Sequence, residues 1–171
     1  MLEHGADANV EGGKYGNPLQ AASSGNHQEI VRLLLEHGAN VNARGGRFGS
    51  ALSAASFRGH RVIVCLLLEY GGDMNTHEGA FGNALYAASL HNRLVTVRLL
   101  LEHGADVNAQ GGRRANALQA ALSEGYYWIV QLLLEYGADI NAQGGFYSNL
   151  KLRRREVMIW SFSYYWSTER R

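Results

Sequence analysis

Histidine is the residue type in this sequence that most readily suggests chemistry, because imidazole binds metals and transfers protons near neutral pH. Three of the seven histidines, His4, His37 and His103, are separated by multiples of 33 residues, but Tyr70 and Tyr136 occupy the same series of positions. A position that accepts tyrosine does not behave as a metal-ligand position. The sequence also has no paired histidines at helix spacing, no Ser–His–Asp order and no phosphate-binding glycine loop. We therefore expect no enzyme activity, no catalytic residue, no metal site and no cofactor.

The single cysteine, Cys65, is the other reactive side chain. It cannot form an internal disulfide, which suits a reducing intracellular compartment. Cys65 stands where the related segments have Arg32, Arg98 and Gln131, so we predict that it is partly exposed and favour an ordinary surface cysteine over a regulatory thiol. The N-terminus lacks the pattern of a secretory signal, and no segment approaches the roughly 18–20 apolar residues of a membrane span. We expect a soluble protein of the cytoplasm or nucleus, without a membrane partner.

The elements that would position any functional side chain are repeated. The stretch NPLQAASSGNHQEIVRLLLEHGANVNARGG, residues 17–46, recurs in related form every 33 residues. A fixed period of this length predicts a stacked array in which each unit contacts only its neighbours. The expected organisation is a partial unit at 1–6, an array at 7–149 and a divergent basic and aromatic tail at 150–171. Within the array we expect units near 7–39, 40–72, 73–105 and 106–138 and a partial unit at 139–149.

Each unit is expected to contain two short antiparallel helices followed by a hairpin-like loop. The first helix is predicted to begin after a capping side chain, which accepts a backbone hydrogen bond in the first turn. A Gly or Asn that tolerates a left-handed backbone is predicted to end each helix. The cap positions are Asn17, Ser50, Asn83 and Asn116; the ends of the first helices are Asn26, Gly59, Asn92 and Gly125; those of the second helices are Gly38, Gly71, Gly104 and Gly137.

These residues resemble the ankyrin repeat, whose helix–turn–helix–hairpin unit has this period and a T-P-L-H-x-A signature. The chain departs from that signature at its first position, with Asn or Ser for Thr, and at its fourth, with Gln20, Ser53, Tyr86 and Gln119 for His. Asn with Gln can make equivalent hydrogen bonds, whereas Tyr86 fits less well. The resemblance implies an all-α solenoid that acts as a non-catalytic module for binding another protein, with no small-molecule substrate. The G-G-[KR]-[YF]-G-N variant is also similar to fungal ankyrin arrays of nucleotide-binding signalling proteins, so a fragment of such a sensor array is the alternative.

By this resemblance, a partner would contact the hairpin tips and the exposed side of the first helices. Large apolar side chains flanked by arginine are typical of binding hot spots, which favours contact for Phe57, Arg58 and Leu90. For the aromatic column of Tyr15, Phe48 and Phe81 we favour packing of hairpin against hairpin. The Asn42, Asn75, Asn108 and Asn141 column is expected to brace one hairpin to the next. The candidate partner-binding residues are Lys14, Arg47, Phe57, Arg58, Leu90, His91, Arg113, Arg114 and Glu124.

Charge is distributed unevenly along the chain. From Lys151 onward there are six basic and two acidic residues, whereas the preceding 150 residues carry ten basic and thirteen acidic ones. The array therefore lacks a broad basic surface for nucleic acid. The tail fits either a divergent cap on the last unit or an unrelated, out-of-register end. A minor alternative function is nucleic-acid binding through residues 151–155, with Trp160, Tyr164 and Tyr165 as stacking groups.

Overall fold

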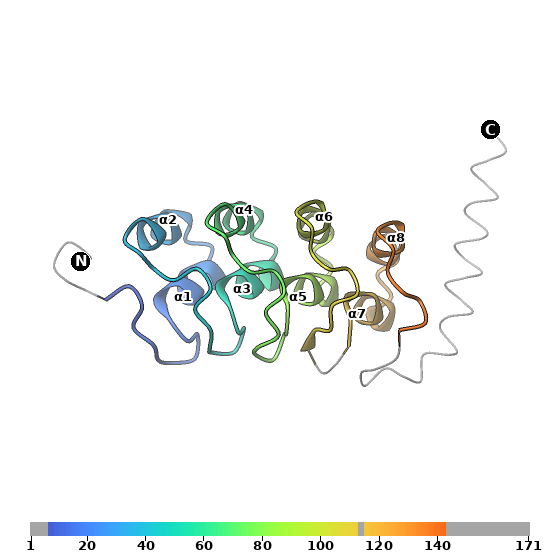
Figure 1. The fold of residues 1–171 in the computed structure, drawn as a ribbon, viewed down its shortest axis with the longest axis horizontal. Coiled ribbons are helices and arrows are strands. Elements are labelled where there is room, and N and C mark those ends of the chain that lie inside the picture. The colour runs from blue at the N-terminus through green and yellow to red at the C-terminus, as the bar shows by residue number, and fades with distance from the viewer. Residues whose placement is uncertain (1–6, 113–114, 143–171) are drawn as a thin grey trace.

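The computed structural model describes residues 7–112 and 115–142, and this part of the chain is a row of paired helices (Figure 1). The first helices of successive copies lie side by side in one layer, and the second helices form a layer above them. Loops extend from the layer of first helices to one edge. The first helices are α1 (Pro18–Ser24), α3 (Ala51–Arg58), α5 (Ala84–Leu90) and α7 (Ala117–Glu124). The second helices are α2 (Gln28–Glu36), α4 (Arg61–Glu69), α6 (Leu94–Glu102) and α8 (Tyr127–Glu135).

The predicted caps are confirmed in all four first helices. The side chains of Asn17, Ser50, Asn83 and Asn116 each accept a hydrogen bond from the backbone N–H three residues later. Pro18 occupies the first turn of α1, where its missing N–H has no cost. In α7 the bond is reciprocal, because Gln119 accepts from the backbone N–H of Asn116 at 3.1 Å. The first helices therefore begin where local side-chain chemistry requires.

The predicted helix ends are confirmed as well. Asn26, Gly59, Asn92 and Gly125 all have positive φ, between 57° and 79°. The four glycines that follow the second helices also have positive φ, between 80° and 86°. A left-handed residue lets the chain reverse after a short helix and satisfies the last carbonyl groups. This periodic reversal gives each unit its antiparallel helix pair and keeps the units in register.

Leucine and alanine join the two layers. The leucines of the first helices (Leu19, Leu52, Leu85 and Leu118) are buried, as are most of the small alanines beside them. Each first helix packs on its own second helix, and α1 with α3, α3 with α5 and α5 with α7 pack as neighbours. Small side chains at these contacts allow close approach of the helices. The result is the all-α repeat solenoid expected from the sequence, here within the residues that the structure describes.

The end of the row shows how much of this burial depends on a neighbour. Ile30 and Leu33 on α2 are 49% and 45% exposed, whereas the corresponding Ile63 and Leu66 on α4 are buried. α4 packs against α2, and α2 has no second helix on its other side within the described residues. An internal copy therefore buries apolar surface on both sides, as expected for a linear array.

Asparagine side chains brace the loops that follow the second helices. Asn42 donates to the carbonyl of Gly71 at 3.0 Å and accepts from the N–H of Asp73 at 2.7 Å. Asn9 and Asn108 make the same pair of bonds to the next copy. The prediction is therefore confirmed for Asn42 and Asn108. It is wrong for Asn75, whose side chain makes neither bond. The expectation for Asn141 falls on a copy that lies outside the described residues.

The fourth signature position is satisfied differently from copy to copy. Gln20 and Gln119 each donate to a loop carbonyl of the next copy, Ala43 at 3.1 Å and Ala142 at 3.0 Å. The shorter Ser53 bonds the Gly82 carbonyl at 3.0 Å. The ring of Tyr86 is buried against Gly111, and any Cβ at position 111 would collide with it. A glycine in the next copy therefore makes room for the tyrosine that fits the signature least well.

Candidate functional site

The hairpin tips form a connected row. The N–H of Arg47 donates to the carbonyl of Lys14 at 3.2 Å, and the N–H of Ala80 donates to the carbonyl of Arg47 at 3.0 Å. All three side chains are exposed. Backbone bonds between copies hold the tips at fixed spacing, although the sequence contains no direct signal for them. The candidates Arg113 and Arg114 lie outside the described residues.

Aromatic rings stack behind the tips. The ring centroids of Tyr15 and Phe48 are 6.5 Å apart, and those of Phe48 and Phe81 are 5.4 Å apart; both pairs are stacked. Phe48 is only 3% exposed, whereas Tyr15 at the end of the row is 38% exposed. The prediction that these three residues pack hairpin against hairpin is confirmed, and Phe48 has little surface left for a partner.

Phe57 joins the ring stack to the first helices. Its ring lies 5.3 Å from that of Phe48, 4.4 Å from that of Phe81 and 4.0 Å from that of His91, measured between centroids. The side chain is half-buried, so it is not the fully exposed apolar residue that the sequence suggested. The reason is its position at the end of α3, where the side chain reaches the rings of two hairpins. The ring of Phe57 therefore packs α3 against the rings of the hairpins. Its exposed part also belongs to the surface.

Leu90 and His91 extend this surface along α5. Leu90 is half-buried and packs on the cluster formed by Tyr86, Ala115 and Ala120. The pKa of His91 is lowered, mainly by burial and further by the positive charges of Arg93 and Arg58, while Glu124 opposes the shift. A neutral imidazole is compatible with its contact to Phe57. Glu124, at the end of α7, is exposed.

Cations lie over the aromatic rings. Lys14 Nζ is 5.9 Å from the Tyr15 centroid, Arg47 Cζ is 5.2 Å from the Phe81 centroid, and Arg58 Cζ is 5.5 Å from the Phe57 centroid. These are cation–π distances. We call the surface formed by the following residues the cation–aromatic strip: Lys14, Tyr15, Arg47, Phe48, Phe57, Arg58, Phe81, His91 and Arg93.

Arg93 is the member of this strip that sequence reasoning missed. Its Nε–H donates to the carbonyl of Phe57 at 3.1 Å, which satisfies an acceptor at the end of α3. In the preceding copy, Nε2 of His60 lies 3.3 Å from the carbonyl of Ser24. The pKa of His60 is lowered, chiefly by burial, although this contact raises it. The sequence feature that could have indicated this role is that polar residues, His60 and Arg93, directly precede the second helices α4 and α6.

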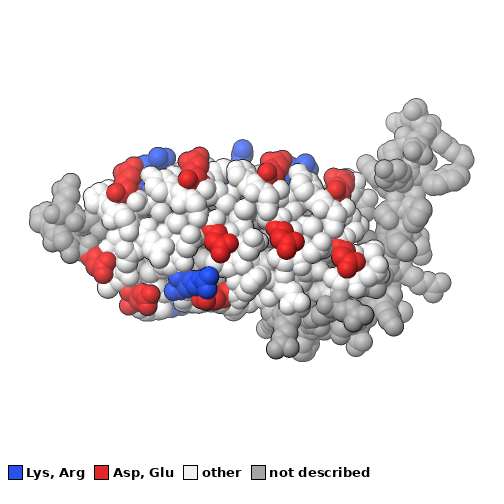
Figure 2. Space-filling model, in the orientation of Figure 1, with Lys and Arg blue, Asp and Glu red and all other residues white. Residues whose placement is uncertain are grey.

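Most of the charged side chains on the face of the molecule shown in Figure 2 are acidic. A row of acidic side chains lies over the second helices, which end at Glu36, Glu69, Glu102 and Glu135, and a second row lies below it. Asp7, Asp73, Asp106 and Asp139 each accept from the backbone N–H two residues later. One exposed ion pair, Arg44 with Glu78 at 3.0 Å, is present within the described residues.

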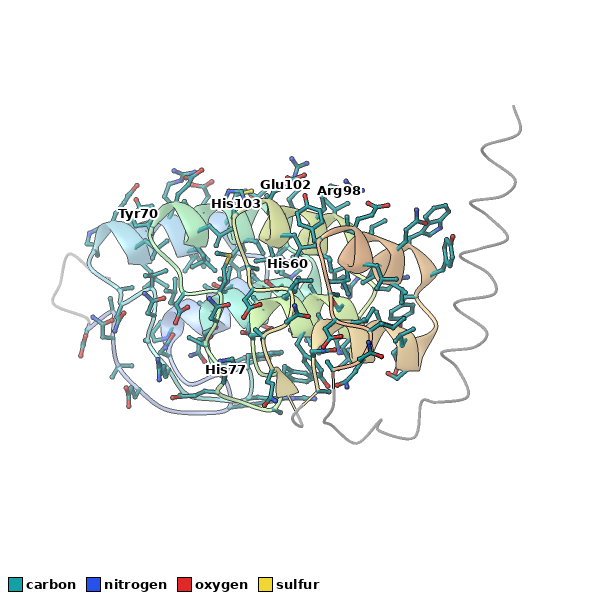
Figure 3. All side chains as sticks on the ribbon, turned by 45° about the vertical axis from the view of Figure 1, so that its right-hand side comes forward. His60, Tyr70, His77, Arg98, Glu102 and His103 are labelled. Carbon is teal, nitrogen blue, oxygen red and sulfur yellow. The ribbon has the colours of Figure 1, made fainter. Side chains whose placement is uncertain are left out.

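The described histidines and Cys65 are distributed over the array. His60, His77 and His103 lie on different parts of the molecule (Figure 3). Within residues 7–112 and 115–142, no three His, Cys, Asp or Glu side chains are arranged to hold a metal ion. Cys65 is half-buried, as predicted. None of the described helices has the length and apolarity needed to cross a membrane. Residues 151–165, on which the nucleic-acid hypothesis depends, lie outside the described residues.

Comparison with known proteins agrees with the architecture. The family model described as ankyrin repeats (3 copies) matches residues 1–78 and, in a second overlapping match, residues 52–144. A search among curated proteins found no significant match. The two family matches cover most of the sequence and coincide with the stacked helix pairs and the periodic caps described above. The chain belongs to the ankyrin-repeat family.

Proposed function

We propose that this chain is a non-catalytic protein-binding module whose contact surface is the exposed part of the cation–aromatic strip together with Leu90 and Glu124. Ankyrin repeats generally act in protein–protein interaction. The strip differs in sequence from copy to copy, whereas the caps and leucines of the scaffold recur in each copy. Variation on a fixed scaffold is how repeat proteins acquire binding specificity.

The physical properties of the strip support binding. Stacked rings and backbone bonds between tips fix its side chains before a partner arrives. Preorganisation reduces the conformational entropy lost on association. Aromatic residues and arginine are also the residue types enriched in binding hot spots.

One observation carries the proposal. Arg47 and Arg58 are exposed, each is placed over an aromatic ring, and neither has a carboxylate partner among the residues that the structure describes. A partner could therefore satisfy both guanidinium groups without first breaking an internal ion pair.

Site-directed photo-crosslinking tests this location. The full chain would carry p-benzoylphenylalanine at Ala80, on the exposed tip row, or at Val95, which is exposed at the start of α6. We expect cross-links to a defined protein from position 80 and none from position 95. Equal capture from both positions, or capture from position 95 alone, would contradict the proposed surface.

A further inference from the structure

We propose that the occupant of the cation–aromatic strip is a linear, carboxylate-rich protein segment, an inference that rests on the proposed function. The cations of the strip belong to two kinds of structural element. Lys14 and Arg47 belong to the hairpin tips, and Arg58 and Arg93 belong to the ends and turns of the first helices. Arg47 lies over the ring of Phe81 and Arg58 over the ring of Phe57, and these two rings are 4.4 Å apart between centroids. A segment that lies across the exposed part of these two rings would therefore meet both guanidinium groups.

The two central arginines are held in place without being neutralised. Each guanidinium is over a ring, Arg47 at 5.2 Å from Phe81 and Arg58 at 5.5 Å from Phe57. Contact with a ring face leaves the in-plane N–H donors available. Guanidinium groups use these donors for paired, charge-assisted hydrogen bonds to carboxylates. Aspartate or glutamate side chains of a partner are thus the groups that Arg47 and Arg58 fit best.

Arg93 adds charge at a fixed position. Its Nε–H is bonded to the Phe57 carbonyl, which anchors the side chain beside the ring contacted by Arg58. The positive charges of Arg93 and Arg58 both lower the pKa of His91. The positive potential of the two arginines therefore overlaps on one part of the strip.

The surrounding charge favours a short acidic segment over a nucleic acid. Residues 7–112 and 115–142 contain twelve acidic and eight basic residues. Acidic rows occupy the face shown in Figure 2. A nucleic acid places phosphates at a density that would extend past the four cations into this negative region. A peptide with a few carboxylates can confine its charge to the strip.

Panning a random 12-residue peptide library on the full chain tests the inference. Arg47→Gln with Arg58→Gln is the test variant, and Arg32→Gln with Arg98→Gln is the matched control, because both control arginines are exposed on second helices. We expect peptides enriched in Asp and Glu on the wild-type chain. Their affinity, measured by fluorescence anisotropy, should fall about tenfold or more in the test variant and change less than about twofold in the control. Circular dichroism melts would show that both variants remain folded.

The other outcomes separate the two proposals. Enrichment of neutral or basic peptides that bind the strip would leave the protein-binding function standing and overturn the acidic partner. Equal loss of affinity in the test and control variants would overturn the assignment to the strip, because net charge alone would then explain binding. Tighter binding of the oligonucleotide dT12 than of the selected peptides would favour nucleic acid instead. Failure to select any peptide would count against both proposals.

Discussion

Two regions of the array use their polar residues in different ways. On the side of the loops that follow the second helices, the same asparagine bonds recur, made by Asn9, Asn42 and Asn108. On the cation–aromatic strip, the polar side chains change from copy to copy. Recurring bonds define the spacing of the copies, whereas Arg47 and Arg58 lie over aromatic rings without a carboxylate partner among the described residues, and we propose that they are available for binding. The comparison separates the scaffold from the proposed contact surface.

The largest effect on the free energy of unfolding is expected at a strip residue that also packs one copy against the next. Phe48→Ala removes a nearly buried ring that contacts Tyr15, Phe57 and Phe81, and we expect a loss of about 3–5 kcal/mol in unfolding free energy. Tyr15→Ala removes one ring contact at an exposed end and should cost only about 0.5–1.5 kcal/mol. Urea denaturation of the full chain measures both. Similar costs for the two variants would show that the ring stack is not anchored at Phe48.

A smaller effect is expected in the loops that follow the second helices. Asn42→Ala removes two hydrogen bonds between copies and should cost about 1–2 kcal/mol. Asn75 occupies the same column without these bonds, so Asn75→Ala should change stability by less than about 0.5 kcal/mol. If both variants had the same urea midpoint, bracing by this column would be refuted.

Two serines of α3 sharpen the distinction between satisfied and unsatisfied groups. Ser56 is fully buried and its Oγ has no hydrogen-bond partner, so Ser56→Ala should leave stability unchanged or raise it by up to about 1 kcal/mol. Ser53 bonds the Gly82 carbonyl, and Ser53→Ala should be destabilising by about 1 kcal/mol. Thermal melts monitored by circular dichroism compare the pair. A clear loss in the Ser56 variant would reveal a role for that hydroxyl.

The smallest predicted effect is a dependence of stability on pH. The folded-state pKa of His91 lies below the ordinary value of about 6.5 because burial disfavours the charged ring. The unfolded chain therefore binds more protons between these two pKa values, and stability falls as pH decreases from about 7 through 6.5 toward the folded-state pKa. The pKa of His60 shifts in the same direction, so it adds to the loss. His91→Gln should reduce the pH dependence of the melting temperature, and an unchanged dependence would contradict this assignment.

The period and the helix boundaries were predictable because they depend on residues close in sequence. A capping Asn and a left-handed Gly act within one turn, so Asn17 and Gly59 could be assigned from their neighbours alone. The contacts of the strip depend on side chains from different copies. The Arg93 bond to Phe57, the half-burial of Phe57 and the fit of Tyr86 against Gly111 follow from how the copies stack. Aligning the repeats shows which residue occupies each equivalent position. It does not show which side chains of neighbouring copies are in contact.

Amide hydrogen exchange on the full chain, with and without an acidic peptide selected as above, tests most directly whether the strip binds and the loops after the second helices do not. We predict slower exchange on binding in residues 46–49, 57–61, 79–82 and 90–94, at the tips and first-helix ends. Exchange in residues 37–43, 70–76 and 103–109, which follow the second helices, should not change. Protection concentrated in these latter loops, or spread evenly over the loops and the strip, would contradict the account.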